Sequence, residues 1–159
     1  IANRVRFLKE VVAAVVGAIG AGRTGIRLSP WSNANNVGID SDTPALFAEV
    51  AREINAANLA FVHVVEGQTG GPRDCPEAEL VALREAFTVP YIANNGYDGA
   101  TAAEAVASGR AYAVAFGRPF IANPDLPARL EQGAALNPLR PEFLYGGGAE
   151  GYTDYPALG

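Results

Sequence analysis

Helical and β-rich segments alternate along the whole chain, and this alternation constrains the fold more than any other feature. Apolar residues at helical spacing and capping residues predict helices over residues 3–19, 43–55, 76–86 and 100–107. Runs of β-branched and aromatic residues predict strands over residues 24–29, 59–65, 89–93 and 112–116. Strands that alternate with helices form a parallel sheet with right-handed crossovers, so the chain belongs to the α/β class.

Capping residues place several of the boundaries. Thr43 before Pro44 predicts a helix start, and Asp98 predicts another. Asn123, followed by Pro124, predicts a last short helix. Glycine, proline and tyrosine dominate after residue 136. We therefore expect residues 1–159 to form a single partial domain with an irregular tail rich in glycine and proline from about residue 136.

Two architectures are open for four parallel strands. They form either an open flavodoxin-like sheet or half of an eight-stranded barrel, and composition does not decide between them. No strand is followed by a Gly-x-Gly-x-x-Gly turn, which weakens the case for a dinucleotide-binding sheet.

Composition excludes several classes of function. The chain has 49% hydrophobic and 18% charged residues, which is typical of a folded domain. A net charge of −5 without a basic cluster argues against nucleic acid and anionic membranes as partners, and no apolar run approaches the ~20 residues of a bilayer span. The single cysteine excludes an internal disulfide and favours a reducing, cytoplasmic compartment. With one histidine, we expect no metal site.

The chain begins at Ile1 and contains no methionine. We expect it to be part of a larger protein that was cut, rather than a complete translation product.

Polar residues and glycines gather where the third and fourth predicted strands end. Asn94, Asn95 and Gly96 follow the third strand, and Gly117 and Arg118 follow the fourth. In a complete barrel these would be strands seven and eight, whose loops often bind phosphate. Small residues let backbone N–H groups approach the anion, and an arginine adds a forked, charged contact. The alternative is that the glycines are turn residues and the arginine is a surface ion-pair partner.

Arg27 is unusual because it lies in the middle of a predicted strand. Its side chain points opposite to those of Ile26 and Leu28. A guanidinium inside a barrel costs several kcal/mol of desolvation unless it is paired, so we expect an anionic or electron-rich partner. The alternative is a buried structural ion pair.

Three long motifs carry a resemblance to a known family. They are Gly25–Pro30, Ala113–Leu126 and Tyr145–Pro156, and the opening Asn3–Phe7 is similar to the start of the family's fourth barrel helix. Together they resemble the old yellow enzyme family of flavin-dependent ene-reductases, in order and over essentially the whole chain. The resemblance implies a (β/α)8 TIM barrel that binds FMN, of which this chain is the C-terminal half with strands five to eight.

The resemblance also assigns residues. Arg27 matches the arginine that faces N1 and the C2 carbonyl of the flavin. The FMN phosphate is assigned to the loop of Asn94, Asn95 and Gly96, with Gly117 and Arg118 as its second contact. Tyr145 matches a tyrosine near the substrate pocket, and its alternative is packing within the glycine-rich tail.

No catalytic residue is expected in this chain. In the family, the substrate-activating histidine pair and the proton-donating tyrosine follow strand four, which would precede Ile1. We therefore interpret His63 as a residue with satisfied hydrogen bonds at the end of strand six, with Glu66 near enough to orient it. The chain departs from the family in two places. Residues 67–71 lie where many relatives carry an aromatic residue in the loop after strand six, and Asn95 stands where relatives often have glycine.

The resemblance favours an NAD(P)H-dependent FMN oxidoreductase that reduces activated alkenes such as enones. Its partners would be an N-terminal half-barrel, in the same polypeptide or as a separate chain, a small enone-type substrate and, in one possibility, further copies of itself. One alternative is a non-catalytic half-barrel that binds only phosphate or flavin. Another is an unrelated isomerase or aldolase, which the lone lysine, Lys9, disfavours as a Schiff-base enzyme.

Overall fold

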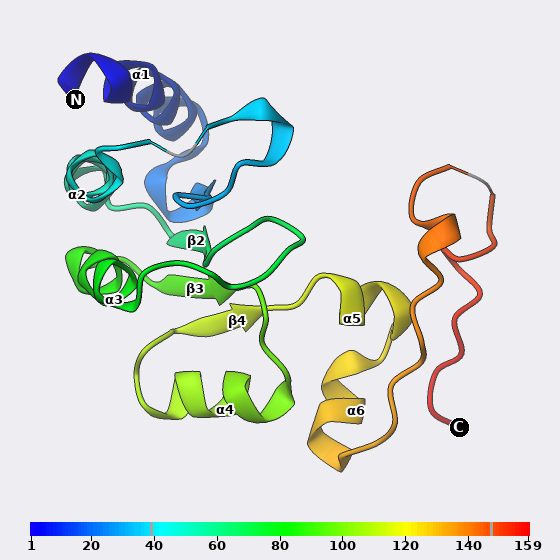
Figure 1. Ribbon diagram of the computed structural model, residues 1–159. Helices are drawn as coiled ribbons and strands as arrows, with labels where there is room; N and C mark the ends of the chain where they lie inside the picture. The colour runs from blue at the N-terminus through cyan, green and yellow to red at the C-terminus, as the bar shows by residue number, and fades with distance from the viewer. Residues whose placement is uncertain (39, 147) are drawn as a thin grey trace. The chain divides into compact units, whose positions relative to one another are not determined.

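The computed structural model describes residues 1–38, 40–146 and 148–159, so Gly147 of the third motif lies outside it. The chain divides into two compact units, Ile1–Ala115 and Phe116–Gly159, and each is described by itself. Figure 1 shows the elements of both.

The first unit is a four-stranded parallel sheet with four α-helices. The helices are α1 (Ala2–Ile19), α2 (Thr43–Ala57), α3 (Glu77–Ala86) and α4 (Gly99–Ala107). The strands are β1 (Gly25–Leu28), β2 (Phe61–Val65), β3 (Tyr91–Asn94) and β4 (Ala113–Ala115). Short 3-10 helices η1 (Ala21–Arg23) and η2 (Ala34–Asn36) flank β1.

The strand order is β1-β2-β3-β4, so each strand pairs with the next one along the chain. One hydrophobic core joins residues of all four helices to one face of the sheet. That face contributes Leu28, Val62, Val64 and Ala93 to the core. The helices therefore cover a single face, as they do in a barrel wall, whereas an open doubly wound sheet carries helices on both faces. This arrangement favours the half-barrel over the flavodoxin-like sheet.

The opposite face, called here the inner face, carries the alternate residues of each strand. Arg27, His63, Ile92 and Ala113 are partners across the four strands in one row. Gly25 pairs with Phe61, whose ring occupies the space where a Cβ on Gly25 would lie, at 2.3 Å from the nearest ring carbon. A side chain at position 25 would displace that ring.

The predicted boundaries are close to those observed. Asp98 caps α4 in a full capping box with Thr101, as expected. The cap of α2 is Asp42, one residue before the predicted Thr43. The helix α1 packs against α2, yet Val11, Val15 and Ile19 remain 37–50% exposed. The apolar stripe of α1 is therefore wider than the part of the stripe that is buried within this unit.

The second unit differs most from expectation. It holds two short helices, α5 (Arg118–Ala122) and α6 (Leu126–Gln132), and the 3-10 helix η3 (Pro141–Phe143) in the predicted tail. Asn123 does not cap the last helix. It ends α5, where its buried side chain donates to the Pro119 carbonyl and accepts from the Asn137 amide. Asp125 caps α6 instead.

The core of the first unit gives a direct test of the packing. Leu80 on α3 is fully buried, while its neighbour Val81 is 39% exposed. Leu80→Ala should lower the free energy of unfolding by about 3 kcal/mol, because it leaves a cavity in the core. Val81→Ala, measured in the same urea titrations, should cost under about 1 kcal/mol. Equal losses would contradict this packing.

Candidate functional site

The carboxyl ends of the four strands lie at one edge of the sheet, because the strands are parallel. The loops after β1, β2 and β3 gather at that edge, and three of the predicted flavin-binding residues lie there with Arg27 beneath them on the inner face. These are Asn94, Asn95 and Gly96. The first unit therefore brings together four of the predicted site residues.

Arg27 is exposed on the inner face. Its Nη2 donates a 3.4 Å hydrogen bond to Oδ1 of Asn94, and no salt bridge to Arg27 is found among the residues described. Within the described part of this unit, Arg27 therefore does not form the buried structural ion pair that was the alternative. Because the Arg27 side chain is exposed, the desolvation cost expected for a buried guanidinium is not incurred in this unit.

His63 is the cross-strand neighbour of Arg27 on the same face. Its pKa is lowered by partial burial and then by the positive charge of Arg27, while a hydrogen bond with Asn94 opposes both. Its Nε2 is buried and has no hydrogen-bond partner in the described part of the chain. The expectation of a satisfied histidine at the strand end is therefore wrong, since His63 lies in mid-strand with one nitrogen unmet.

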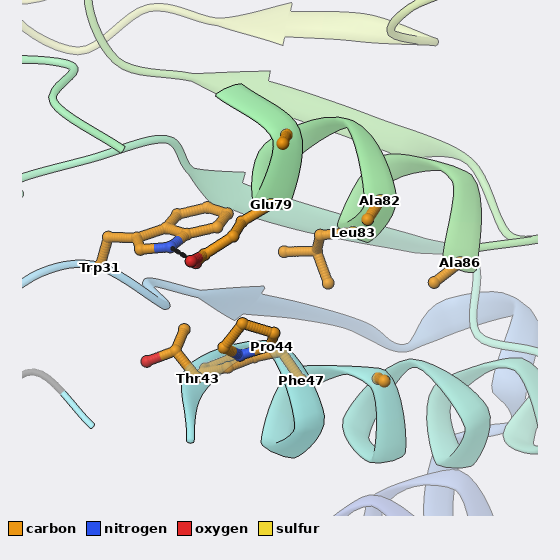
Figure 2. A pocket seen from close by; sticks show the side chains of 10 residues that line it. Trp31, Thr43, Pro44, Phe47, Glu79, Ala82, Leu83 and Ala86 are labelled. Carbon is orange, nitrogen blue, oxygen red and sulfur yellow. Dashed lines mark hydrogen bonds between the residues drawn. The ribbon is translucent and has the colours of Figure 1, made fainter. Parts of the chain in front are cut away.

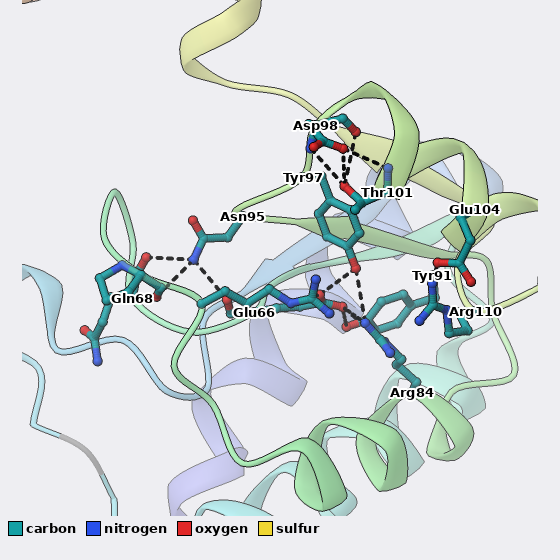
Figure 3. A network of polar contacts seen from close by, with 12 residues as sticks. Glu66, Gln68, Arg84, Tyr91, Asn95, Tyr97, Asp98, Thr101, Glu104 and Arg110 are labelled. Carbon is teal, nitrogen blue, oxygen red and sulfur yellow. Dashed lines mark hydrogen bonds and ion pairs between the residues drawn. The ribbon is translucent and has the colours of Figure 1, made fainter.

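The side chains of Asn94 and Asn95 both bind other parts of the first unit. Asn94 Nδ2 donates to the Ala115 carbonyl on β4 at 2.7 Å. Asn95 Nδ2 lies within hydrogen-bond distance of three carbonyls of the loop after β2, as Figure 3 shows in part. Because these side-chain amides are already used, the loop has its backbone N–H groups to offer an anion. Asn95 and Gly96 have consecutive positive φ values of 94° and 70°, and turns of this kind can form a concave nest of N–H groups.

Glu66 lies directly beneath this loop and is fully buried. Its Oε1 accepts from Arg84 at 2.8 Å and from the Tyr91 hydroxyl at 3.0 Å. Its Oε2 accepts from the Tyr97 hydroxyl at 2.8 Å (Figure 3). The same oxygen pairs with Arg73 at 3.1 Å. Two cations and two hydroxyls thus surround one carboxylate, so its buried charge is paired.

This network corrects one expectation and adds residues that were not predicted. Glu66 does not orient His63, because its carboxylate is bound by side chains from α3 and from the loops after β2 and β3. Arg73 also stacks on Tyr97 at 4.6 Å and packs beside Gly96, where an added Cβ would lie 3.4 Å from its own. No local pattern in the sequence signals these contacts, since the partners lie up to 31 residues apart.

Gly117, Arg118 and Tyr145 belong to the second unit. Gly117 precedes α5, and Arg118 is its first residue. Tyr145 follows η3 and is 95% exposed, so its ring is not packed within that unit. Because the units are described separately, the union of these residues with Asn95 and Gly96 stays a prediction.

A pocket of about 250 Å³ lies between α2 and α3 (Figure 2). Its wall is mostly apolar, with Phe47 and Leu83 among its members, and Trp31 donates there to Glu79 at 3.0 Å. It contains no cationic residue among those described, so it does not fit a phosphate. The strand-end edge remains the better candidate.

The described residues contain no group of three His, Cys, Asp or Glu side chains that could hold a metal ion. None of their helices combines the length and the apolar character that crossing a membrane requires.

Comparison with known proteins places these features in context. The profile of the NADH:flavin oxidoreductase / NADH oxidase family matches residues 1–137. The 12-oxophytodienoate reductase 2 of Arabidopsis thaliana is 40% identical over 98% of this chain and 42% of its own length. The chain thus spans about two fifths of the length of such relatives.

Solved structures give the same result. Morphinone reductase in complex with tetrahydroNAD matches with a TM-score of 0.90 and 42% identity, over 99% of this chain and 42% of that one. The old yellow enzyme from Trypanosoma cruzi matches with a TM-score of 0.90 and 33% identity, over 98% of this chain and 41% of that one. The predicted fold class, the C-terminal half of a (β/α)8 TIM barrel, is confirmed.

The Glu66 network predicts a specific response to alkaline pH. Burial, followed by the hydrogen bond to Glu66 and its charge, raises the pKa of Tyr97 from 10.0 to about 12. An unfolded chain releases this proton near pH 10 while the folded chain retains it, so stability should fall as pH rises from 10 to 12. In Tyr97→Phe the slope of unfolding free energy against pH should be shallower over that range.

The control for this prediction is Tyr112→Phe, which alters a tyrosine that is 73% exposed. Urea titrations at several pH values should give the wild-type slope for this control. A Tyr97→Phe slope that matches the wild type would remove Tyr97 from the network as drawn.

Proposed function

Because the chain belongs to the NADH:flavin oxidoreductase / NADH oxidase family, which includes the old yellow enzymes, we propose that it supplies the FMN-anchoring half of an oxidoreductase. The proposed reaction is the reduction of activated alkenes, such as α,β-unsaturated carbonyl compounds, with NAD(P)H. When bound, FMN would supply the chemistry of hydride transfer between the nicotinamide and the β-carbon of the alkene. The name of one solved relative includes tetrahydroNAD, which supports a nicotinamide reductant.

The residues at the strand-end edge fit FMN. The cofactor has an anionic phosphate at one end and an electron-rich N1 and C2 carbonyl on its ring. Arg27 offers an exposed guanidinium without a carboxylate partner in the described chain, beside the unmet Nε2 of His63. The turn at Asn95 and Gly96 offers backbone N–H groups for the phosphate. Arg27 on the uncovered face is the observation that carries the proposal.

Arg27 would stabilise negative charge on the flavin ring. A fixed cation beside the atoms where charge develops acts most strongly once water is excluded. Asn94 orients the guanidinium through its Oδ1, and partial burial and the charge of Arg27 lower the pKa of His63, which disfavours a second cation beside Arg27. Arg27 is then the cation that this row of the inner face presents.

The remaining roles complete the proposal. Gly117 and Arg118 would form the second phosphate contact, and Tyr145 would line the substrate side. The substrate-activating pair and the proton donor would come from an N-terminal half-barrel, in the same polypeptide or as a separate chain. The uncovered inner face and the free edges of β1 and β4 support such a partner. We propose a cytoplasmic protein that acts on a small molecule, without nucleic acid or membrane partners, and self-association is a further possibility.

A second candidate is a half-barrel that binds flavin without catalysis. The sequence favours it in one respect: His63 is the single histidine, so this chain does not itself contain the histidine pair that would activate a substrate.

Colour and mass of the purified protein separate these two functions. A yellow complex that oxidises NAD(P)H in the presence of an enone, with a second half-barrel in the same complex or polypeptide, would support the oxidoreductase. Flavin binding without turnover would support the second candidate. Protein that stays colourless after addition of FMN, with no change in flavin fluorescence, would exclude both for this chain.

Arg27 provides the sharpest single-residue test. Arg27→Ala should weaken FMN binding ten- to a hundredfold or lower the reduction potential of the bound flavin, since a charged hydrogen bond contributes ~1.5–3 kcal/mol. Fluorescence titration and redox titration measure the two effects. The control is Arg23→Ala, which removes an exposed arginine just before the opposite end of β1. If the two variants bind and reduce FMN alike, Arg27 does not contact the flavin.

A further inference from the structure

The three loops at the strand-end edge are tied together by side-chain amides. The Asn33 backbone N–H donates to Gln68 Oε1 at 3.1 Å, and Gln68 Nε2 donates to the Trp31 carbonyl at 3.0 Å. Ser32 and Thr69 add a hydroxyl pair at 2.8 Å. These contacts join the loop after β1 to the loop after β2.

Asn95 joins the loop after β2 to the loop after β3. Its Nδ2 lies 2.9 Å from the Glu66 carbonyl, 3.1 Å from that of Gln68 and 3.3 Å from that of Pro72. A primary amide has two hydrogens, so one of them is shared between acceptors. The same residue that provides a backbone N–H to the proposed phosphate nest is therefore held through its side chain by the neighbouring loop.

The loop that Asn95 holds is closed on itself. The Gln68 N–H donates to the Pro72 carbonyl at 2.9 Å, and the Gly71 N–H donates to the Gln68 carbonyl at 3.0 Å. At Gly67, with φ 94°, an added Cβ would lie 2.7 Å from the Pro72 oxygen. The carbonyls of Gln68 and Pro72, which close the loop, are also the ones that Asn95 binds.

The backbone conformation of Asn95 shows why its side-chain contact matters. Its φ of 94° is uncommon for a residue with a side chain, and glycine would adopt it without strain. A glycine would, however, leave the turn free to sample other conformations before an anion binds. The asparagine amide removes that freedom.

We propose that Asn95 is a positioning residue whose amide clamps the loop 67–74 and thereby holds the Asn95–Gly96 turn in its phosphate-binding geometry before FMN arrives. This inference rests on the proposed function. It gives the Asn95 side chain a role that needs no contact with the phosphate. This role is additional to the one proposed for the Asn95 backbone. Preorganisation of this kind increases affinity by reducing the ordering that binding requires.

The test compares Asn95→Gly with wild type in the binding of FMN and of riboflavin, which lacks the phosphate. Asn95→Gly should raise the FMN dissociation constant roughly tenfold, because the turn must then be ordered when FMN binds, and should leave riboflavin binding unchanged. Asn95→Asp should give the same or a larger loss, because a carboxylate cannot donate to the three carbonyls. Fluorescence titration of the full chain, or of the complex that contains it, measures each constant.

The matched control is Asn58→Gly. Asn58 also has a positive φ, 49°, and it ends α2 at an exposed position away from the strand-end edge. Its replacement should change neither flavin affinity. Equal losses for FMN and riboflavin in Asn95→Gly would mean a general structural role and would overturn the proposal, as would no loss at all.

Amide hydrogen exchange separates failure of this inference from failure of the proposed function. Without flavin, Asn95→Gly should speed exchange at Gln68 and Gly71, whose N–H groups close the loop. Unchanged exchange would disprove the clamp. If wild-type protein binds neither flavin, the proposed function and its coupling to Asn95 both fail, and the exchange rates still decide whether the clamp exists.

Discussion

Each strand of the sheet alternates between a face that meets helices and a face that no helix of its unit covers, and the rest of the first unit follows from this asymmetry. Burial of Val62, Val64 and Ala93 against the helices supplies the hydrophobic free energy of folding. The same alternation turns Arg27 and His63 to the other side. Polar and charged groups can occupy that face because the core lies elsewhere, so under the proposed function stability and flavin binding would use opposite faces of the same strands.

Glu66 connects the two sides. It follows β2 directly, its backbone N–H donates to the Asn94 carbonyl, and its own carbonyl accepts from the Asn95 amide. Its carboxylate binds Arg84 on α3 and Tyr97 after β3. A buried charge is tolerated only when its partners are in place, so removal of the charged partner Arg84 should cost about 3–5 kcal/mol, and removal of a tyrosine hydroxyl should cost less. The loop geometry at the strand-end edge is therefore coupled to the position of a helix on the far face.

The sequence predicts those parts of the structure that depend on local patterns. Periodicity and capping residues place the helices and strands of the first unit within a few residues, and Asp98 illustrates why, since its cap is formed within four residues. Contacts between distant segments have no such signal. The Glu66 network and the partners of the Asn95 amide arise from tertiary packing, and α5 is too short to show a helical period. His63 shows the same limit, because its unmet nitrogen depends on neighbours across the sheet.

The choice of asparagine at position 95 is an energetic compromise that stability alone does not explain. Positive φ at a residue with a side chain costs about 1–3 kcal/mol, and a hydrogen bond contributes roughly 1 kcal/mol net. Two or three such bonds to the loop 67–74 therefore about offset the strain, so asparagine and glycine should be similar in folding free energy at this position. The two residues differ in how well ordered the turn is before a ligand binds. Asparagine joins two loops, whereas glycine would leave the turn to be ordered when a ligand binds, so under the proposed function a rigid phosphate site would favour asparagine at this position.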